Sequence, residues 1–312
     1  MSDAGNSLAV AAGVPSGPGA ARLERTRSQE SPSIWLLAWH RFRRHKAGLV
    51  ALVVIVVEIL VAVSAPLLIP RELAIDPNPL NILQRPSREH WLGTDEVGRD
   101  IFARLIYASR ISLSIGFLAV AVAIVVGTTV GATAGFFGGW LENVLMRVTD
   151  AILSIPALFF LIVLSVTLGP SVRTMIIVIG LLSWMELARI IRANVLSLKR
   201  REFVEAAQTI GARSTRIIGR HILPNTLAPI VVAATLGVGN ALLTEASVSY
   251  LGLGVQPPEP SWGNMLYNAQ SYFFNAPWIT LYPGIMILIT VLCINFVGDG
   301  LRDALDPRMK NQ

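Results

Sequence analysis

Long apolar runs separated by short polar segments are the main pattern in this chain. A helix that crosses roughly 30 Å of hydrocarbon needs about 20 residues, and it satisfies its own backbone amides. Six runs meet or approach this length, at residues 47–69, 111–135, 151–168, 175–185, 227–250 and 278–297. The sequence therefore predicts an all-α polytopic membrane protein with six transmembrane helices.

The fourth of these runs is the shortest. Residues 175–185 are uncharged, but Glu186, Arg189 and Arg192 follow. Because charged side chains are costly in hydrocarbon, we expect this helix to emerge from the membrane and to continue into water.

Composition supports the membrane interpretation. Hydrophobic residues make up 53% of the 312 positions, charged residues make up 15%, and the mean hydropathy is +0.58. The net charge of +6 is compatible with nucleic-acid binding. However, the basic residues lie between apolar runs and not along one polar face. We expect a lipid membrane, and no nucleic acid, among the partners.

The sequence lacks the common patterns of catalytic and metal-binding sites. The single cysteine, Cys293, lies inside an apolar run, so the chain alone can form neither a disulfide nor a cysteine-based metal site. The four histidines have no metal-ligand spacing such as H-E-x-x-H, and no G-x-S-x-G marks a nucleophile. We therefore predict no catalytic residue and no metal site.

Basic residues are distributed unevenly between the two sides of the predicted spans. Cytoplasmic segments near membrane ends accumulate Lys and Arg. If both termini lie inside, 19 of these residues are cytoplasmic and 7 lie outside. We expect a multi-pass protein of the cell (inner) membrane with both termini in the cytoplasm.

A polar segment at residues 201–225 lies between the fourth and fifth predicted spans. A helix from about Arg201 would end near Gly211, which can take the left-handed conformation of a helix C-cap. Ser214 could then cap a second helix that leads to Pro224. The segment predicts a helix-turn-helix at the cytoplasmic face.

The side chains of this segment favour docking onto another protein. Ala206 and Ala207 are small, so the backbone there could press closely into a groove. Glu202 and Glu205, with the neighbouring arginines, offer charged contacts at its rim.

The same segment resembles the EAA loop of binding-protein-dependent ABC importer permeases. His221 is one departure, because the general pattern favours Ile there. The resemblance covers residues from about 35 to 308 and includes further matching stretches at 90–100, 245–254 and 260–263. Over this range the chain is similar to the C-type subunit of dipeptide, oligopeptide and nickel permeases. The residues that match the EAA loop are Glu205, Ala206, Ala207, Gly211, Leu223 and Pro224.

This resemblance implies the type I ABC importer permease fold, with its core at residues 109–300. Residues 34–108 would hold the first transmembrane helix and an extracytoplasmic segment, and 301–312 a cytoplasmic C-terminus. Residues 1–33 are rich in Ala, Gly, Pro, Ser and Arg without apolar periodicity, so we expect a disordered cytoplasmic tail.

The resemblance also implies partners. They are a homologous permease subunit, two ABC ATPase subunits that contact the EAA loop, and an extracytoplasmic substrate-binding protein. We expect no cofactor on this chain, with ATP and Mg²⁺ held by the ATPase subunits. A phosphate-binding Walker loop needs Gly-Lys-Ser/Thr, and none of the three lysines, Lys46, Lys199 and Lys310, follows a glycine.

The expected activity is import of short peptides through a pathway of which this chain forms half. The same branch also imports nickel chelates, glutathione and other small solutes. A secondary transporter or a membrane sensor is the alternative from another class, and neither would need the docking loop.

Polar residues within and outside the spans give further candidates. Glu58 and Glu245 should point into the bundle or a wet cavity, because a charge facing lipid costs on the order of 2 to 3 kcal/mol or more. For Glu245, near Asn240, a role in the pathway or in an inter-subunit contact stands beside structural hydrogen bonding. Gly127, Gly131 and Gly135 are spaced for close helix packing.

Two outside segments, at 70–110 and 252–277, would meet the substrate-loaded receptor according to the resemblance. Asp95 and Asp100 could coordinate a cation, although solvated or helix-capping carboxylates are the simpler interpretation. The candidate residues facing the receptor are Asp95, Arg99, Asp100 and Trp262.

Overall fold

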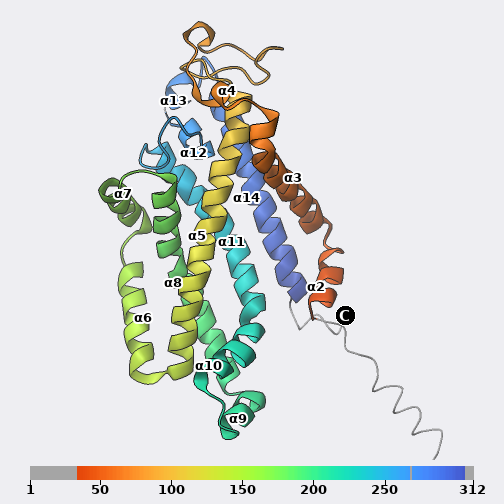
Figure 1. Cartoon of the computed structure of the whole chain (residues 1–312), viewed down its shortest axis with the longest axis vertical. Helices are drawn as coiled ribbons and strands as arrows, with labels where there is room; N and C mark the ends of the chain where they lie inside the picture. Colours follow the sequence, from red (N-terminus) through yellow and green to blue (C-terminus); the bar gives the residue numbers. More distant parts are fainter. Residues whose placement is uncertain (1–33, 268, 306–312) are drawn as a thin grey trace, which may run out of the picture.

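The computed structural model describes residues 34–267 and 269–305, which form a bundle of helices (Figure 1). Within these ranges there is no β-strand, only an isolated bridge between Thr94 and Asp100. The predicted tail at 1–33 and the residues from 306 onward lie outside the described ranges. The all-α prediction is confirmed.

Within the described residues, five helices are long and apolar enough to cross a membrane. They are α3 (Lys46–Leu68), α5 (Ile101–Phe137), α8 (Val172–Lys199), α11 (Leu223–Tyr250), which continues α10, and α14 (Trp278–Leu305). Each contains one of the predicted apolar runs or nearly all of it, so five of the six predicted spans are confirmed as helices.

The third predicted span differs from the expected single helix. Helix α6 (Gly139–Leu153) and helix α7 (Ala157–Leu168) meet at an angle of 85°. Pro156 explains the break, because proline lacks an amide hydrogen and disfavours a helical conformation in the residue before it. The apolar run at 151–168 is thus divided between two helices.

The two bent helices still return the chain to the opposite end of the bundle. Helix α5 ends beside α6, and α8 begins at the other end, near α7 (Figure 1). Counted as one bent span, the segment α6–α7 gives the described chain a sixth pass.

Short helices mark the two ends of the bundle. Helix α9 (Glu202–Thr209), with α10 (Ser214–Ile217) and the π-helical turn η2 (Ile218–Ile222), lies at what we name the α9 end. The α4 end is opposite (Figure 1). Its short helices are α4 (Arg71–Ile75), the 3₁₀ turn η1 (Pro79–Asn81), α12 (Trp262–Met265) and α13 (Ala269–Tyr272).

Three glycines hold α5 and α8 close together. A Cβ atom added to Gly131 would lie 2.4 Å from the Ala188 carbonyl oxygen. One added to Gly127 would lie 2.7 Å from the carbonyl oxygen of Trp184, and one added to Gly135 would lie 2.9 Å from that of Arg192. The packing role predicted from the glycine spacing is confirmed.

The charged part of α8 packs against α6. Arg192 Nε donates a hydrogen bond to Glu142 Oε1 at 2.6 Å, and Arg189 pairs with Asp150 at 2.5 Å. As predicted, the helix continues past Met185. However, Glu186 lies beside Val120 and Ala123 of α5, level with the middle of the apolar run at 111–135, so the expectation that the helix leaves the membrane at Glu186 is wrong.

The two ends of the described chain lie near each other. Helix α2 (Ile34–Phe42) contacts the last turns of α14, and a Cβ atom on Gly300 would lie 2.9 Å from the Phe42 ring. Both described ends therefore lie at one end of α14.

Candidate functional site

Helix α9 is fastened to the bundle by its inward face. Val204 and Ala207, three residues apart, are 0% and 6% exposed. They belong to an apolar cluster with Phe136 of α5, Val195 of α8 and Ile222 of η2. Since residues three apart share one face of a helix, one side of α9 is committed to the chain itself.

This packing corrects the expectation for one alanine. Ala206 is exposed, as docking requires, but Ala207 faces its own bundle. Successive helical residues point about 100° apart, so the pair cannot both press into the same external groove.

The outward face of α9 carries both charge and apolar surface. Glu202 and Glu205 are exposed. Ile210 is 84% exposed and Phe203 43%. A projecting helix with exposed apolar side chains and acidic neighbours is typical of a protein-protein contact.

Gly211 ends α9 in the predicted conformation. Its φ is +78°, its amide donates to the Gln208 carbonyl at 2.9 Å, and the Ala212 amide donates to the Ala207 carbonyl at 3.0 Å. These two bonds form a Schellman motif, which favours glycine at this position. The predicted C-cap is confirmed.

The second half of the predicted helix-turn-helix differs in detail. Ser214 does not cap the helix, because Arg213 is the N-cap residue and makes no side-chain cap bond. The helix does not stop at Pro224 either. It continues through η2 into α11. Pro224 lies in the first turn of α11, directly after the π-helical turn η2, where a residue without an amide hydrogen is tolerated. Leu223 is half-buried against the α9 cluster.

At the α4 end, Asp95 organises a buried network of ions. Its Oδ1 accepts hydrogen bonds from the amides of Val97 and Arg99, and its Oδ2 lies 2.7 Å from Arg99 Nε. Arg104 Nε lies 3.4 Å from the same Oδ2 and its Nη1 donates to the Ala74 carbonyl. Because the ion pairs of Asp95 with Arg99 and Arg104 are buried, they hold the segment before α5 in one conformation.

Asp100 caps α5. Its Oδ1 accepts a hydrogen bond from the Ala103 amide at 2.8 Å, and its Oδ2 lies 2.8 Å from His90 Nδ1. A carboxylate at a helix N-terminus satisfies a free amide and complements the helix dipole. The structure therefore supports the helix-capping alternative. Within the described residues no three His, Cys, Asp or Glu side chains group as a metal site.

The candidates for a receptor-facing role are buried, which corrects that expectation. Asp95 is 4% exposed, Arg99 and Asp100 are each 9%, and Trp262 is 1%. Asp95 and Asp100 accept hydrogen bonds from the amides of residues 97, 99 and 103, which need internal partners. Arg99 pairs with Asp95, and Trp262 belongs to the buried apolar core.

Glu245 joins three elements through hydroxyl groups. Ser112 Oγ of α5 donates to Glu245 Oε2 at 3.2 Å, and Ser249 Oγ of α11 donates to Oε1 at 2.7 Å. Ser112 Oγ also accepts from the Trp262 amide at 3.1 Å. Glu245 is 1% exposed. These contacts favour structural hydrogen bonding, while a pathway or inter-subunit role stays a prediction.

Glu58 and Asn240 are the remaining polar candidates within the spans. The Thr290 hydroxyl of α14 lies 3.0 Å from Glu58 Oε2 of α3, so Glu58 points into the bundle as expected. Asn240 is exposed and lines a cavity between α5, α8 and α11.

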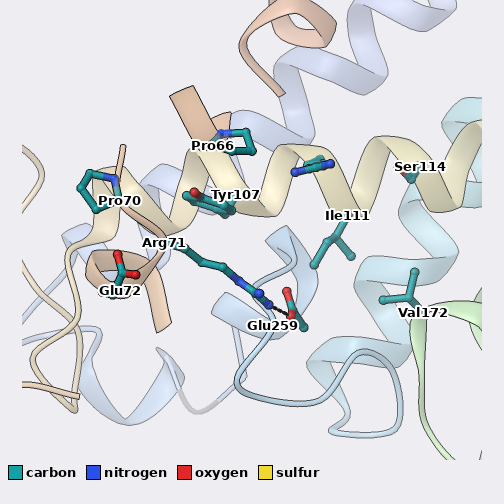
Figure 2. Close-up of a pocket in the computed structure, with 10 residues that line it drawn as sticks. Pro66, Pro70, Arg71, Glu72, Tyr107, Ile111, Ser114, Val172 and Glu259 are labelled. Carbon is teal, nitrogen blue, oxygen red and sulfur yellow. Dashed lines mark hydrogen bonds and ion pairs between the residues drawn. The ribbon is translucent and has the colours of Figure 1, made fainter. Parts of the chain in front are cut away.

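A larger cavity of about 690 Å³ opens at the α4 end (Figure 2). Arg71 of α4 and Glu259 point toward each other there and form an ion pair. Tyr107 and Arg110 of α5 also line the cavity. The sequence analysis missed this pair because the two residues are 188 positions apart and neither lies in a recognisable motif.

Comparison with known families matches both parts of the chain. Residues 127–311 match the family model described as the binding-protein-dependent transport system inner membrane component. Residues 33–86 match the model of the N-terminal TM domain of oligopeptide transport permease C. The first match covers more than half of the sequence.

Curated relatives cover nearly the whole chain. The chain is 45% identical to the dipeptide transport system permease protein DppC of Alkalihalophilus pseudofirmus, over 89% of this chain and 91% of that protein. It is 41% identical to the oligopeptide transport system permease protein OppC of Bacillus subtilis, over 91% and 92%. It is 40% identical to the glutathione transport system permease protein GsiD of Escherichia coli, over 88% and 91%.

A solved structure shares the fold. The structure of the MetNI methionine ABC transporter in an inward-facing conformation matches with a TM-score of 0.55 and 20% identity, over 65% of this chain and 96% of that one. The fold class is therefore that of an ABC importer permease. With the family models and relatives, this places the chain in the family of binding-protein-dependent transport system inner membrane components, as a permease subunit of an ABC importer.

Proposed function

We propose that α9 docks onto an ABC ATPase subunit and passes the movement of that subunit to the membrane spans. The observation that carries this proposal is the two-sided character of α9. Its inward face is buried against α5, α8 and η2, while Glu205, Ala206 and Ile210 face outward. A helix that packs against its own bundle on one side and is exposed on the other can pass the displacement of a docked subunit to that bundle.

The route of transmission is a continuous helix. From Ser214 the chain runs through η2 and α11 to Tyr250. Val204 and Ala207 of α9 pack with Ile217 and Ile222 at the start of this helix. Displacement of α9 would therefore tilt α11, which contacts both α5 and α14.

ATP and Mg²⁺ belong to the ATPase subunits in this proposal. The chain has three lysines and none of them follows a glycine, so it lacks a Walker loop to hold phosphates. The complex would contain a homologous permease, two ATPase subunits and a substrate-binding protein at the α4 end. The α9 end and both termini would face the cytoplasm, which agrees with the positive-inside rule.

Short peptides are the cargo that the relatives favour. The names of these relatives cover dipeptides, oligopeptides and glutathione, and glutathione is itself a small peptide. The ligand that co-purifies with the cognate binding protein tests this assignment. A nickel chelate in place of a peptide would overturn it.

The coupling proposal is tested by co-purification of the permease with its ATPase subunits. The double variant Glu205→Arg with Gly211→Asp reverses an outward charge and strains the left-handed cap. We expect it to lose the ATPase subunits and uptake, while the protein remains in the membrane.

Glu89→Arg is the matched control, because Glu89 is also exposed but lies at the α4 end. It should retain the ATPase subunits. Intact assembly and transport in the double variant would contradict the proposed docking, and uptake without any ATPase subunit would favour a secondary transporter.

A further inference from the structure

Glu186 lies on a cavity between three membrane-spanning helices. The cavity has a volume of about 360 Å³ and is formed by α5, α8 and α11. Val120 and Ala123 line it from α5, close to the middle of the apolar run at 111–135. The cavity is therefore at mid-depth in the spans and not at either end of the bundle.

Three polar side chains line this cavity: Ser183 and Glu186 of α8, and Asn240 of α11. The other lining residues are apolar and several are small. Ala123, Ala233, Ala234 and Gly237 leave room beside the polar groups. Among the described residues no Lys or Arg lines the cavity, so the carboxylate there has no cationic neighbour in this part of the wall.

Glu186 differs from the other two glutamates in these spans. Glu58 accepts a hydrogen bond from Thr290, and Glu245 accepts from Ser112 and Ser249. In the part of the chain that the structure describes, the side chains of Glu186 and Asn240 have no hydrogen-bond or ion-pair partner. Arg189, one turn along α8, pairs instead with Asp150 of α6.

A carboxylate at this depth requires water or a cation. Facing lipid, it would cost on the order of 2 to 3 kcal/mol or more, and such residues usually mark a substrate or ion pathway. The open side of the cavity offers a carboxylate, an amide oxygen and a hydroxyl oxygen. All three accept hydrogen bonds, and a primary ammonium group donates three.

We propose that Glu186, assisted by Asn240 and Ser183, binds the ammonium group of the cargo during its passage through the membrane. This inference rests on the proposed import of peptides, each of which carries an ammonium group at its N-terminus. The cavity is a transient binding site whose carboxylate stabilises a positive charge at mid-depth, where the surrounding helices are apolar.

The direct test is binding of dialanine to the purified permease–ATPase complex without the binding protein, followed by saturation-transfer NMR. We expect saturation transfer to dialanine and little to N-acetyl-dialanine, which lacks the ammonium group. Glu186→Gln should reduce dialanine binding about tenfold, the loss expected for a charge-assisted hydrogen bond. Glu186→Asp, which keeps the charge, should restore part of it.

Glu89→Gln is the control, because it removes an exposed carboxylate at the α4 end. It should bind dialanine as the unchanged complex does. Equal binding of the acetylated peptide, unchanged binding by Glu186→Gln, or no binding to the unchanged complex would each overturn the proposal.

Uptake in proteoliposomes separates the sources of ammonium. In vesicles of phosphatidylcholine and phosphatidylglycerol, no lipid carries a primary ammonium group. A roughly tenfold loss of peptide uptake by Glu186→Gln in these vesicles supports the cargo as the ligand. A loss that needs phosphatidylethanolamine would assign the site to lipid and overturn the proposal.

The same assays distinguish this inference from the proposed function. If Glu186→Gln assembles and transports like the unchanged complex, only the ammonium site fails. If the unchanged complex neither assembles with ATPase subunits nor imports peptide, the proposed function fails. If Glu186→Gln loses the partner permease, the residue serves an inter-subunit contact and the cargo role is overturned.

Discussion

At the scale of single residues, three glutamates within the spans have different surroundings. Glu58 and Glu245 are buried and accept hydrogen bonds from hydroxyl groups, whereas Glu186 is exposed beside a cavity. The cost of a carboxylate in hydrocarbon predicted that Glu58 and Glu245 would face inward. It could not predict which hydroxyl groups they would meet, because Ser112 is 133 positions from Glu245.

Glu245→Ala should destabilise the protein. The change leaves the hydroxyls of Ser112 and Ser249 without their buried acceptor, and unpaired polar groups of this kind cost roughly 1–3 kcal/mol each. We expect a lower melting temperature for the purified complex, measured by thermal unfolding in detergent. Glu245→Gln, which keeps one acceptor oxygen and the side-chain volume, should lie between the two.

Transport assays give the contrary outcome for Glu245. If Glu245→Ala melts like the unchanged protein but transports no peptide, the residue acts in the pathway and its hydrogen bonds are incidental. In the thermal unfolding measurement, Glu89→Ala, at an exposed position, controls for loss of a carboxylate alone.

Gly211→Ala should loosen the end of α9. At φ +78° a Cβ atom costs roughly 1–2 kcal/mol, although no neighbouring atom lies within 4 Å of it. Hydrogen exchange of the peptide at residues 202–212 should be at least about fivefold faster, since 1.4 kcal/mol corresponds to a factor of ten. Asparagine tolerates this conformation better, so Gly211→Asn should fall between glycine and alanine. Equal exchange in all three proteins would contradict a strained cap.

At the scale of helices, apolar length was sufficient to predict the position of five spans. The break between α6 and α7 was harder to foresee, because residues 151–168 are almost uniformly apolar and only Pro156 signals a bend. The inward orientation of Ala207 was also missed, because a sequence motif gives the identity of its residues but does not indicate which of their side chains are buried. The buried ion network around Asp95 depends on contacts from Arg99 and Arg104 that a local pattern does not reveal.

Gly131→Ala should separate α5 from α8. Its Cβ atom would lie 2.4 Å from the Ala188 carbonyl oxygen and 3.0 Å from Ile191 Cβ, so backbone must move. Overpacking of this kind costs about 1–3 kcal/mol, partly offset by the higher helix propensity of alanine. A lower melting temperature of the purified complex is the expected result.

Gly284→Ala makes the same chemical change in α14, where a Cβ atom meets nothing within 4 Å. It should leave the melting temperature unchanged or raise it, because only the propensity gain remains. If both variants melt alike, the close approach of α5 and α8 does not limit stability.

At the scale of the whole molecule, the number of passes and the charge distribution together determine the orientation we propose. Six passes return the chain to the side on which it began, and the basic residues favour the cytoplasm for that side. The family could be predicted from the segment at 201–225 with its supporting stretches. The cargo could not, because no residue in those stretches distinguishes a peptide from another small solute.

The orientation and the broken third pass can be tested with single cysteines in a Cys293→Ala background. Leu80 at the α4 end is 89% exposed and Ile210 at the α9 end is 84% exposed. In spheroplasts that express the permease without its ATPase subunits, which would cover Ile210, a membrane-impermeant maleimide should label Leu80→Cys directly but Ile210→Cys only after permeabilisation. Val163→Cys in α7, which is 60% exposed among apolar neighbours, should resist labelling from both sides because a thiol in lipid does not ionise. Labelling of Ile210→Cys from outside would reverse the proposed orientation. Ready labelling of Val163→Cys would place α7 in water and reduce the spans to five.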